Sequence, residues 1–102
     1  MLQFVLELRA FAAAISRDDY LASRVLNLAF EKLFINLGEA ANRIDLAQRE
    51  TISGVPWRQI VGLRNILAHG YEQIEHESLF RTAAHDLGTV ESALRAWLDG
   101  QA

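Results

Sequence analysis

The chain has 102 residues, 51% of them hydrophobic and 23% charged, a length and composition that exclude disorder and favour one globular domain over residues 1–102. It contains no cysteine, which excludes a disulfide framework and a thiolate metal site and is compatible with the reducing cytoplasm in which we expect it. The net charge of −3 is spread along the sequence, so no basic stripe indicates nucleic-acid binding, and any phosphate chemistry must be local.

The opening "MLQFVLELRAFAAAI" is apolar enough to resemble a signal peptide, but Glu7 and Arg9 interrupt it. No stretch approaches the roughly 20 apolar residues that a membrane span requires, so we expect no membrane association. Spacings of three and four instead predict an amphipathic helix that ends near Ser16. Its buried stripe would contain Leu2, Val5, Leu8, Ala12 and Ile15.

The next segment begins with a helix-start signal, because Ser16 precedes Asp19 by three residues as in a capping box. A short helix can begin there. The longest helix is predicted over residues 23–44, with a nearly heptad-spaced stripe of Leu26, Phe30, Leu33, Leu37, Ala41 and Ile44. Residues 45–55 lose this period and contain Gly54, which predicts a loop with one turn of helix at most.

Pro56 suits the first position of a third helix, where its missing N–H is harmless. That helix should run to about His69, and Gly70 suits the left-handed residue that often ends a helix. A last helix is predicted from a stripe of Leu79, Ala83, Leu87, Val90, Leu94 and Trp97. No strand pattern competes, so we expect an all-α fold, a four- to five-helix up-and-down bundle.

The third helix is apolar over an unusually wide arc. Ile60, Val61, Leu67 and Ala68 lie on one side, and Leu63 and Ile66 widen the arc to more than half the circumference. Such a helix needs packing partners on two sides. In so small a domain the second partner is expected to be another copy of the chain, which predicts a homodimer.

Arg64 places a permanent charge near the centre of that apolar arc. An unpaired guanidinium would be costly there, so it must meet a carboxylate, a polar cleft or an anionic ligand. A buried ion pair with Glu39 is one alternative, and a side chain that reaches out to water is another. Glu39 could also form a surface pair with Arg43, four residues further along its own helix.

Arg58, Asn65 and His69 project from a neighbouring side of the same helix. Arg64 and His69 differ in direction by roughly 140°, so they can converge only at the helix end or across a symmetric interface. A histidine at this position can also serve simply as a cation at the helix C-terminus.

The remaining candidates predict no metal site and no cofactor. His76 and His85 show neither the H-E-x-x-H spacing nor a cysteine partner. Trp57 and Trp97 lie on apolar faces, so we expect them to pack in the core or an interface rather than against bases.

The segment "RNILAHGY" has the pattern R-x4-H-x-Y, and together with "NLGEAANRI" and "PWRQIVGLRN" it resembles the HepT-like family of HEPN domains. The resemblance extends over residues 26–98. It implies an HEPN-like all-α bundle that dimerises so that the two motif helices frame a shared cleft. It also implies a metal-independent endoribonuclease toxin, encoded beside a minimal nucleotidyltransferase antitoxin.

Carried onto this sequence, the resemblance implies that Arg64 and His69 are catalytic and that Asn65 supports the arginine. Histidine can move a proton at the ribose 2′-OH and arginine can stabilise the phosphate charge, a reaction that leaves a 2′,3′-cyclic phosphate without a metal. Tyr71 would accept AMP from the partner nucleotidyltransferase, which neutralises the toxin. The alternative is a noncatalytic HEPN partner that binds and regulates the nucleotidyltransferase.

Overall fold

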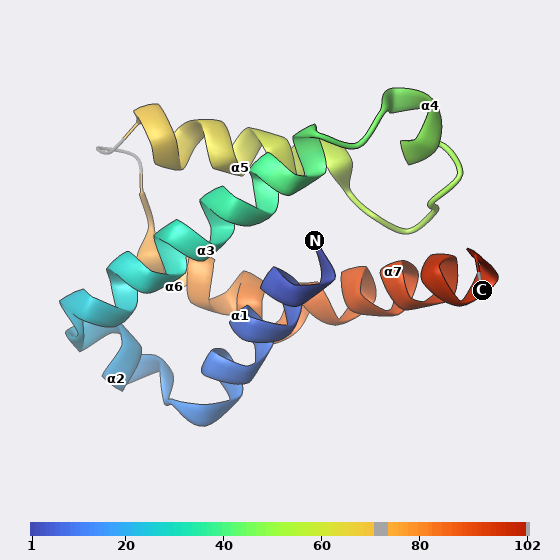
Figure 1. Ribbon diagram of the computed structural model, residues 1–102. Coiled ribbons are helices and arrows are strands. Elements are labelled where there is room, and N and C mark those ends of the chain that lie inside the picture. Colours follow the sequence, from blue (N-terminus) through green and yellow to red (C-terminus); the bar gives the residue numbers. More distant parts are fainter. Residues whose placement is uncertain (71–73, 102) are drawn as a thin grey trace.

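The computed structural model describes residues 1–70 and 74–101, and every regular element in these residues is helical (Figure 1), as predicted for an all-α fold. The long helices are α1 (Leu2–Ala14), α3 (Arg24–Asn42), α5 (Trp57–His69) and α7 (Leu87–Gln101). The short ones are α2 (Arg17–Ala22), α4 (Leu46–Arg49) and α6 (His76–Arg81), and a π-helical turn, η2 (Thr82–Asp86), joins α6 to α7. Within the described residues, no helix is both long enough and apolar enough to cross a membrane.

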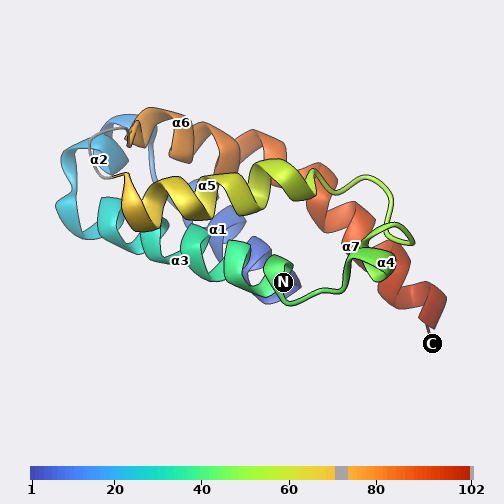
Figure 2. The same ribbon diagram turned by 90° about the horizontal axis from the view of Figure 1, so that it is seen from above.

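The long helices α1, α3, α5 and α7 alternate in direction along the chain. α5 runs antiparallel along α3, and α1 lies on the other side of α3 beside η2 and α7 (Figures 1 and 2). α2 packs against α6 at the end of the molecule where α3 begins. The central helix α3 therefore contacts α1 on one side and α5 on the other, and it holds the motif helix α5 on the bundle.

Side-chain caps mark the breaks between the first three helices. The Ser16 hydroxyl accepts a hydrogen bond from the Asp19 N–H at the start of α2, as its position predicted. The Ser23 hydroxyl accepts from the Leu26 N–H at the start of α3, and the Asp45 carboxylate accepts from the Ala47 N–H at α4. Each cap satisfies a backbone donor that the first helical turn leaves free.

The core contains the predicted residues Val5, Leu8, Leu37 and Ala41, but α3 buries a wider arc than its predicted stripe. Phe34 is buried, whereas Leu26 and Leu33 are only partly so. A heptad stripe describes a helix with one packing face. Because α3 lies between α1 and α5, it buries residues on both sides.

Two local predictions at the ends of α5 are wrong. Pro56 is the cap residue before the helix rather than its first residue, with ψ of 74°, and its carbonyl accepts from the Ile60 N–H. Gly70 has a φ of −121°, so it is not left-handed. Among the described residues the positive φ belongs to Gly54, at 88°, in the turn that leads toward α5.

The last predicted helix is interrupted by η2, and the spacing of its stripe gives the reason. Leu79, Ala83 and Leu87 are all buried and are separated by two steps of four residues. In an α-helix each such step advances about 40° beyond a full turn. The wider π turn takes up part of that advance, so all three side chains stay directed at the core.

Candidate active site

A close approach of α3 and α5 positions the motif arginine. A Cβ atom at Gly38 would overlap the Cβ of Arg64, and it would lie 2.8 Å from the Cγ of Arg64 and 3.1 Å from the Ile60 carbonyl oxygen. Only glycine leaves room for this crossing. The glycine of "NLGEAANRI" therefore sets the distance between the two helices at the point where Arg64 lies across α3.

The guanidinium of Arg64 lies between Glu39 of α3 and its own neighbour Asn65. Its Nη2 is 3.5 Å from the Glu39 Oε1, and its Nη1 donates a 3.0 Å hydrogen bond to the Asn65 Oδ1. The side chain keeps 30% of its exposure, so the charge is not in a dry core. Because a guanidinium has five N–H donors, these two contacts leave donors for an anion.

The structure thus decides between the two partners considered for Glu39. Its carboxylate is paired with Arg64, 25 residues away, rather than with Arg43 on its own helix. The predicted surface pair with Arg43 is wrong because Gly38 brings α5 within reach of Glu39.

His69 is the last residue of α5 and its side chain is exposed. The helix stays regular up to this point, and the Gly70 N–H donates to the Ile66 carbonyl at 2.6 Å. Among the described residues, Arg64 and Asn65 are in contact, whereas His69 makes no hydrogen bond or ion pair with either. Tyr71 lies outside the residues that the structure describes.

α5 has two flanks of opposite character. Its polar flank contains Arg58, Gly62, Asn65 and His69, which lie within about 60° of one another around the helix axis. Its apolar flank contains Ile60, Leu63, Ile66 and Leu67. Ile66 is 42% exposed, although the other three are buried or partly buried.

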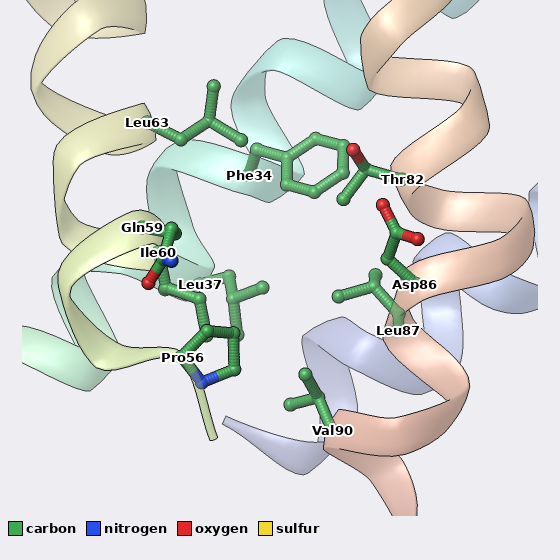
Figure 3. A pocket seen from close by; sticks show the side chains of 10 residues that line it. All are labelled: Phe34, Leu37, Pro56, Gln59, Ile60, Leu63, Thr82, Asp86, Leu87 and Val90. Atoms are coloured by element: carbon green, nitrogen blue, oxygen red, sulfur yellow. The ribbon is translucent and has the colours of Figure 1, made fainter. Parts of the chain in front are cut away.

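Beside the apolar flank, a cleft of about 400 Å³ separates α5 from η2 and α7 (Figure 3). Phe34, Leu37, Ile60 and Leu63 face it from one side, and Leu87 and Val90 face it from the other. Asp86 and Thr82 add polar atoms. The lining is too apolar for phosphate chemistry, and Arg64 does not line it.

A histidine–carboxylate contact outside the motif had no signal in the sequence. The Nε2 of His76, the first residue of α6, lies 2.8 Å from the Oε2 of Glu31 on α3. The nearby Tyr20 hydroxyl has a raised pKa, first because it is buried and second because Glu31 is negatively charged. The contact joins residues 45 positions apart, a distance over which helical periodicity carries no information.

Comparison with known proteins identifies the family of the chain. A family model described as "Ribonuclease HepT-like" matches residues 1–97. A protein of Methanocaldococcus jannaschii named "Putative RNase" is 30% identical over 81 residues, which cover 79% of this chain and 74% of that protein. A protein of the same name from Caldanaerobacter subterraneus subsp. tengcongensis is 30% identical over 81 residues, covering 79% of this chain and 72% of that protein.

A second Methanocaldococcus jannaschii protein named "Putative RNase" is 19% identical over 91 residues, or 89% of this chain and 75% of that protein. No solved structure matches the chain significantly. The all-α bundle and the family match together show a ribonuclease HepT-like helical domain. The chain belongs to the HepT-like ribonuclease family, as its motif segments predicted.

Proposed function

We propose that this chain is a metal-independent endoribonuclease toxin with a composite active site at a homodimer interface. The observation that carries the proposal is the environment of Arg64. Its guanidinium is held by Glu39 and Asn65, its side chain remains 30% exposed, and N–H donors are left for a phosphate. Family membership supplies the class of substrate, RNA, and the proposed reaction uses side chains alone, without a cofactor.

In this reaction, His69 takes the proton from a ribose 2′-OH, and the 2′-oxygen attacks the adjacent phosphorus. The bond from phosphorus to the 5′-oxygen breaks, and that oxygen leaves with a proton supplied by a second His69 across the interface. Arg64 stabilises the charge that develops on the phosphate, and Asn65 orients the guanidinium. The products are a 2′,3′-cyclic phosphate and a free 5′-hydroxyl.

A dimer would give the site the geometry that one chain lacks. Arg64 and His69 leave α5 in directions that differ by roughly 140°, so His69 of a second copy is better placed to complete the site. The exposed Ile66 and the apolar cleft lined by Leu63 offer a surface for that copy; the cleft is drawn in Figure 3. An exposed apolar patch of this kind commonly marks an interface.

We also propose that a cognate nucleotidyltransferase, the antitoxin, neutralises the enzyme by transferring AMP to Tyr71. Tyr71 follows His69 with only Gly70 between them. A phosphodiester-linked nucleotide there would add bulk and negative charge beside the phosphate site and repel RNA. Intact-mass spectrometry after co-expression should show AMP on the wild type and none on Tyr71→Phe.

The catalytic proposal is tested by incubating the purified, unmodified protein with RNA in excess EDTA. We expect cleavage that survives EDTA, is lost in His69→Ala, and yields cyclic phosphate ends. Absence of cleavage by protein whose mass shows no modification would contradict it. That outcome would favour the alternative, a noncatalytic partner of the nucleotidyltransferase in which the Arg64–Glu39 contact is purely structural.

A further inference from the structure

Gly62 has no packing role within the described residues. It lies in the middle of α5, and apart from its two chain neighbours and the backbone of its own helix, a Cβ atom at this position would meet no atom within 4 Å. Glycine inside a helix is less stable than alanine because it loses more backbone freedom on folding. At Gly38 the crossing with Arg64 explains the glycine, but at Gly62 the explanation must lie outside these residues.

Gly62 is part of the floor of a surface groove of about 650 Å³. The groove lies between the polar flank of α5 and the turn of α4, and Trp57, Arg58, Asn65, Arg49 and Glu50 also line it. Because Asn65 accepts the hydrogen bond from Arg64, one end of the groove adjoins the proposed phosphate site.

The groove carries two cations against one carboxylate, although the whole chain has a net charge of −3. Arg58 is exposed and forms no ion pair within the described part of the chain. Arg49 donates to the carbonyls of Ile44 and Ala41 at 3.0 and 3.1 Å. Its guanidinium carbon lies 5.6 Å from the centroid of the Trp57 ring. These contacts hold Arg49 in place and leave some of its five N–H donors for a ligand.

We propose that this groove binds the single RNA strand that flanks the phosphate at Arg64. The strand crosses α5 at Gly62, where the missing side chain lets the sugar–phosphate backbone approach the helix, and Arg58 and Arg49 contact its phosphates. The inference rests on the proposed ribonuclease function and adds a substrate-binding surface to it. A second copy of the chain fits the apolar cleft on the opposite flank better than this charged groove.

The test uses a short, fluorescently labelled, single-stranded oligoribonucleotide with 2′-O-methyl riboses, which the proposed reaction cannot cleave. Fluorescence anisotropy gives the Kd over a series of salt concentrations. Removing one arginine that neutralises a phosphate should lower the slope of log Kd against log salt by about 0.7. We expect that lower slope, with weaker binding, for Arg58→Ala.

The matched control is Arg81→Ala, which removes the same charge from α6, beyond the apolar flank. Its Kd and salt slope should equal those of the wild type. Glu50→Gln removes the one carboxylate of the groove and should tighten binding. Gly62→Gln should weaken binding while its mass in sedimentation equilibrium stays unchanged and its melting temperature stays at or above the wild-type value, because its Cβ lies in open space.

Two outcomes would overturn the assignment of the groove to RNA. Equally weakened binding in Arg58→Ala and Arg81→Ala would mean that RNA responds only to overall charge. A change of oligomeric state in Gly62→Gln would identify a second copy as the occupant.

The same experiments separate RNA binding in the groove from catalysis. Cleavage that depends on His69, combined with unchanged RNA binding by every groove variant, would refute RNA binding in the groove but not the proposed ribonuclease activity. RNA binding that depends on Arg58, without any cleavage, would support RNA binding in the groove and refute the proposed ribonuclease activity. A wild-type protein that neither binds nor cleaves RNA would refute both.

Discussion

The polar and apolar flanks of α5 differ in what covers them as well as in their residues. Beside the polar flank lie the short helix α4 and a groove with Arg49 and Arg58, and beside the apolar flank lie η2, α7 and a cleft lined by Leu63, Leu87 and their neighbours. One helix thus faces two surfaces of opposite chemistry. Under the two proposals above, RNA binds beside the polar flank and a second copy of the chain packs against the apolar flank.

Arg64→Ala tests the proposed phosphate site, which meets the polar flank through the hydrogen bond of Arg64 to Asn65, and should have the largest effect. Removing a preorganised donor to a developing negative charge costs about 10²- to 10³-fold in rate. RNA cleavage should fall by at least that factor while sedimentation equilibrium still shows a dimer. If Arg64→Ala instead unfolds or dissociates, the contact of Arg64 with Glu39 is structural. The catalytic role proposed for Arg64 would then be wrong.

Ile66→Asp tests the apolar flank. Ile66 is 42% exposed in the single chain, so a charge there should leave the fold intact. Fully burying an isoleucine contributes about 1.5–3 kcal/mol, and a dimer would bury the exposed part of Ile66 from both copies, so replacing it should raise the Kd of the dimer about tenfold. Sedimentation equilibrium at micromolar concentration measures this.

The matched control for that variant is Val25→Asp, which charges a valine that is 76% exposed at the start of α3. It should leave the dimer unchanged. A wild type that is already monomeric at micromolar concentration would refute the composite site.

Gly38→Ala tests the side of α5 that faces α3. The new methyl group would overlap the Cβ of Arg64, so the helices must separate. Overpacking of this kind costs about 1–3 kcal/mol, which denaturant unfolding would detect. RNA cleavage should also fall, because Arg64 moves relative to Glu39. An unfolding free energy equal to that of the wild type would show that α3 and α5 can move apart at this crossing without loss of stability.

Gly62→Ala should have the smallest effect and the opposite sign. Its methyl group lies in open space, and alanine is favoured over glycine inside a helix by up to about 1 kcal/mol. Thermal unfolding should show a melting temperature higher by roughly 4–8 °C for each kcal/mol of added stability. A destabilised variant would mean that another part of the assembly already packs against Gly62.

The helices themselves were predictable because their signals are local. Ser16 caps α2 through a donor three residues away, and the apolar stripe of α1 repeats at the helical period. The segments containing Gly38, Arg58 and Arg64 were enough to indicate the family. The character of each flank of α5 also followed from angle alone, since residues four apart share a side.

Two features depended on contacts that no local pattern contains. Glu39 pairs with Arg64 rather than Arg43, and His76 meets Glu31. Each depends on which distant segment arrives at a given place, and at what distance. Helical periodicity says nothing about that.

By itself, then, the sequence determined that the chain is all-α, where its helices lie within a few residues, and to which family it belongs. The tertiary structure decided which helix faces each flank, that Gly38 is needed for a helix crossing, and that Gly62 is not. The physical reason is that a side chain's direction around its own helix is set by its position in the sequence. What it meets there is set by how the helices pack.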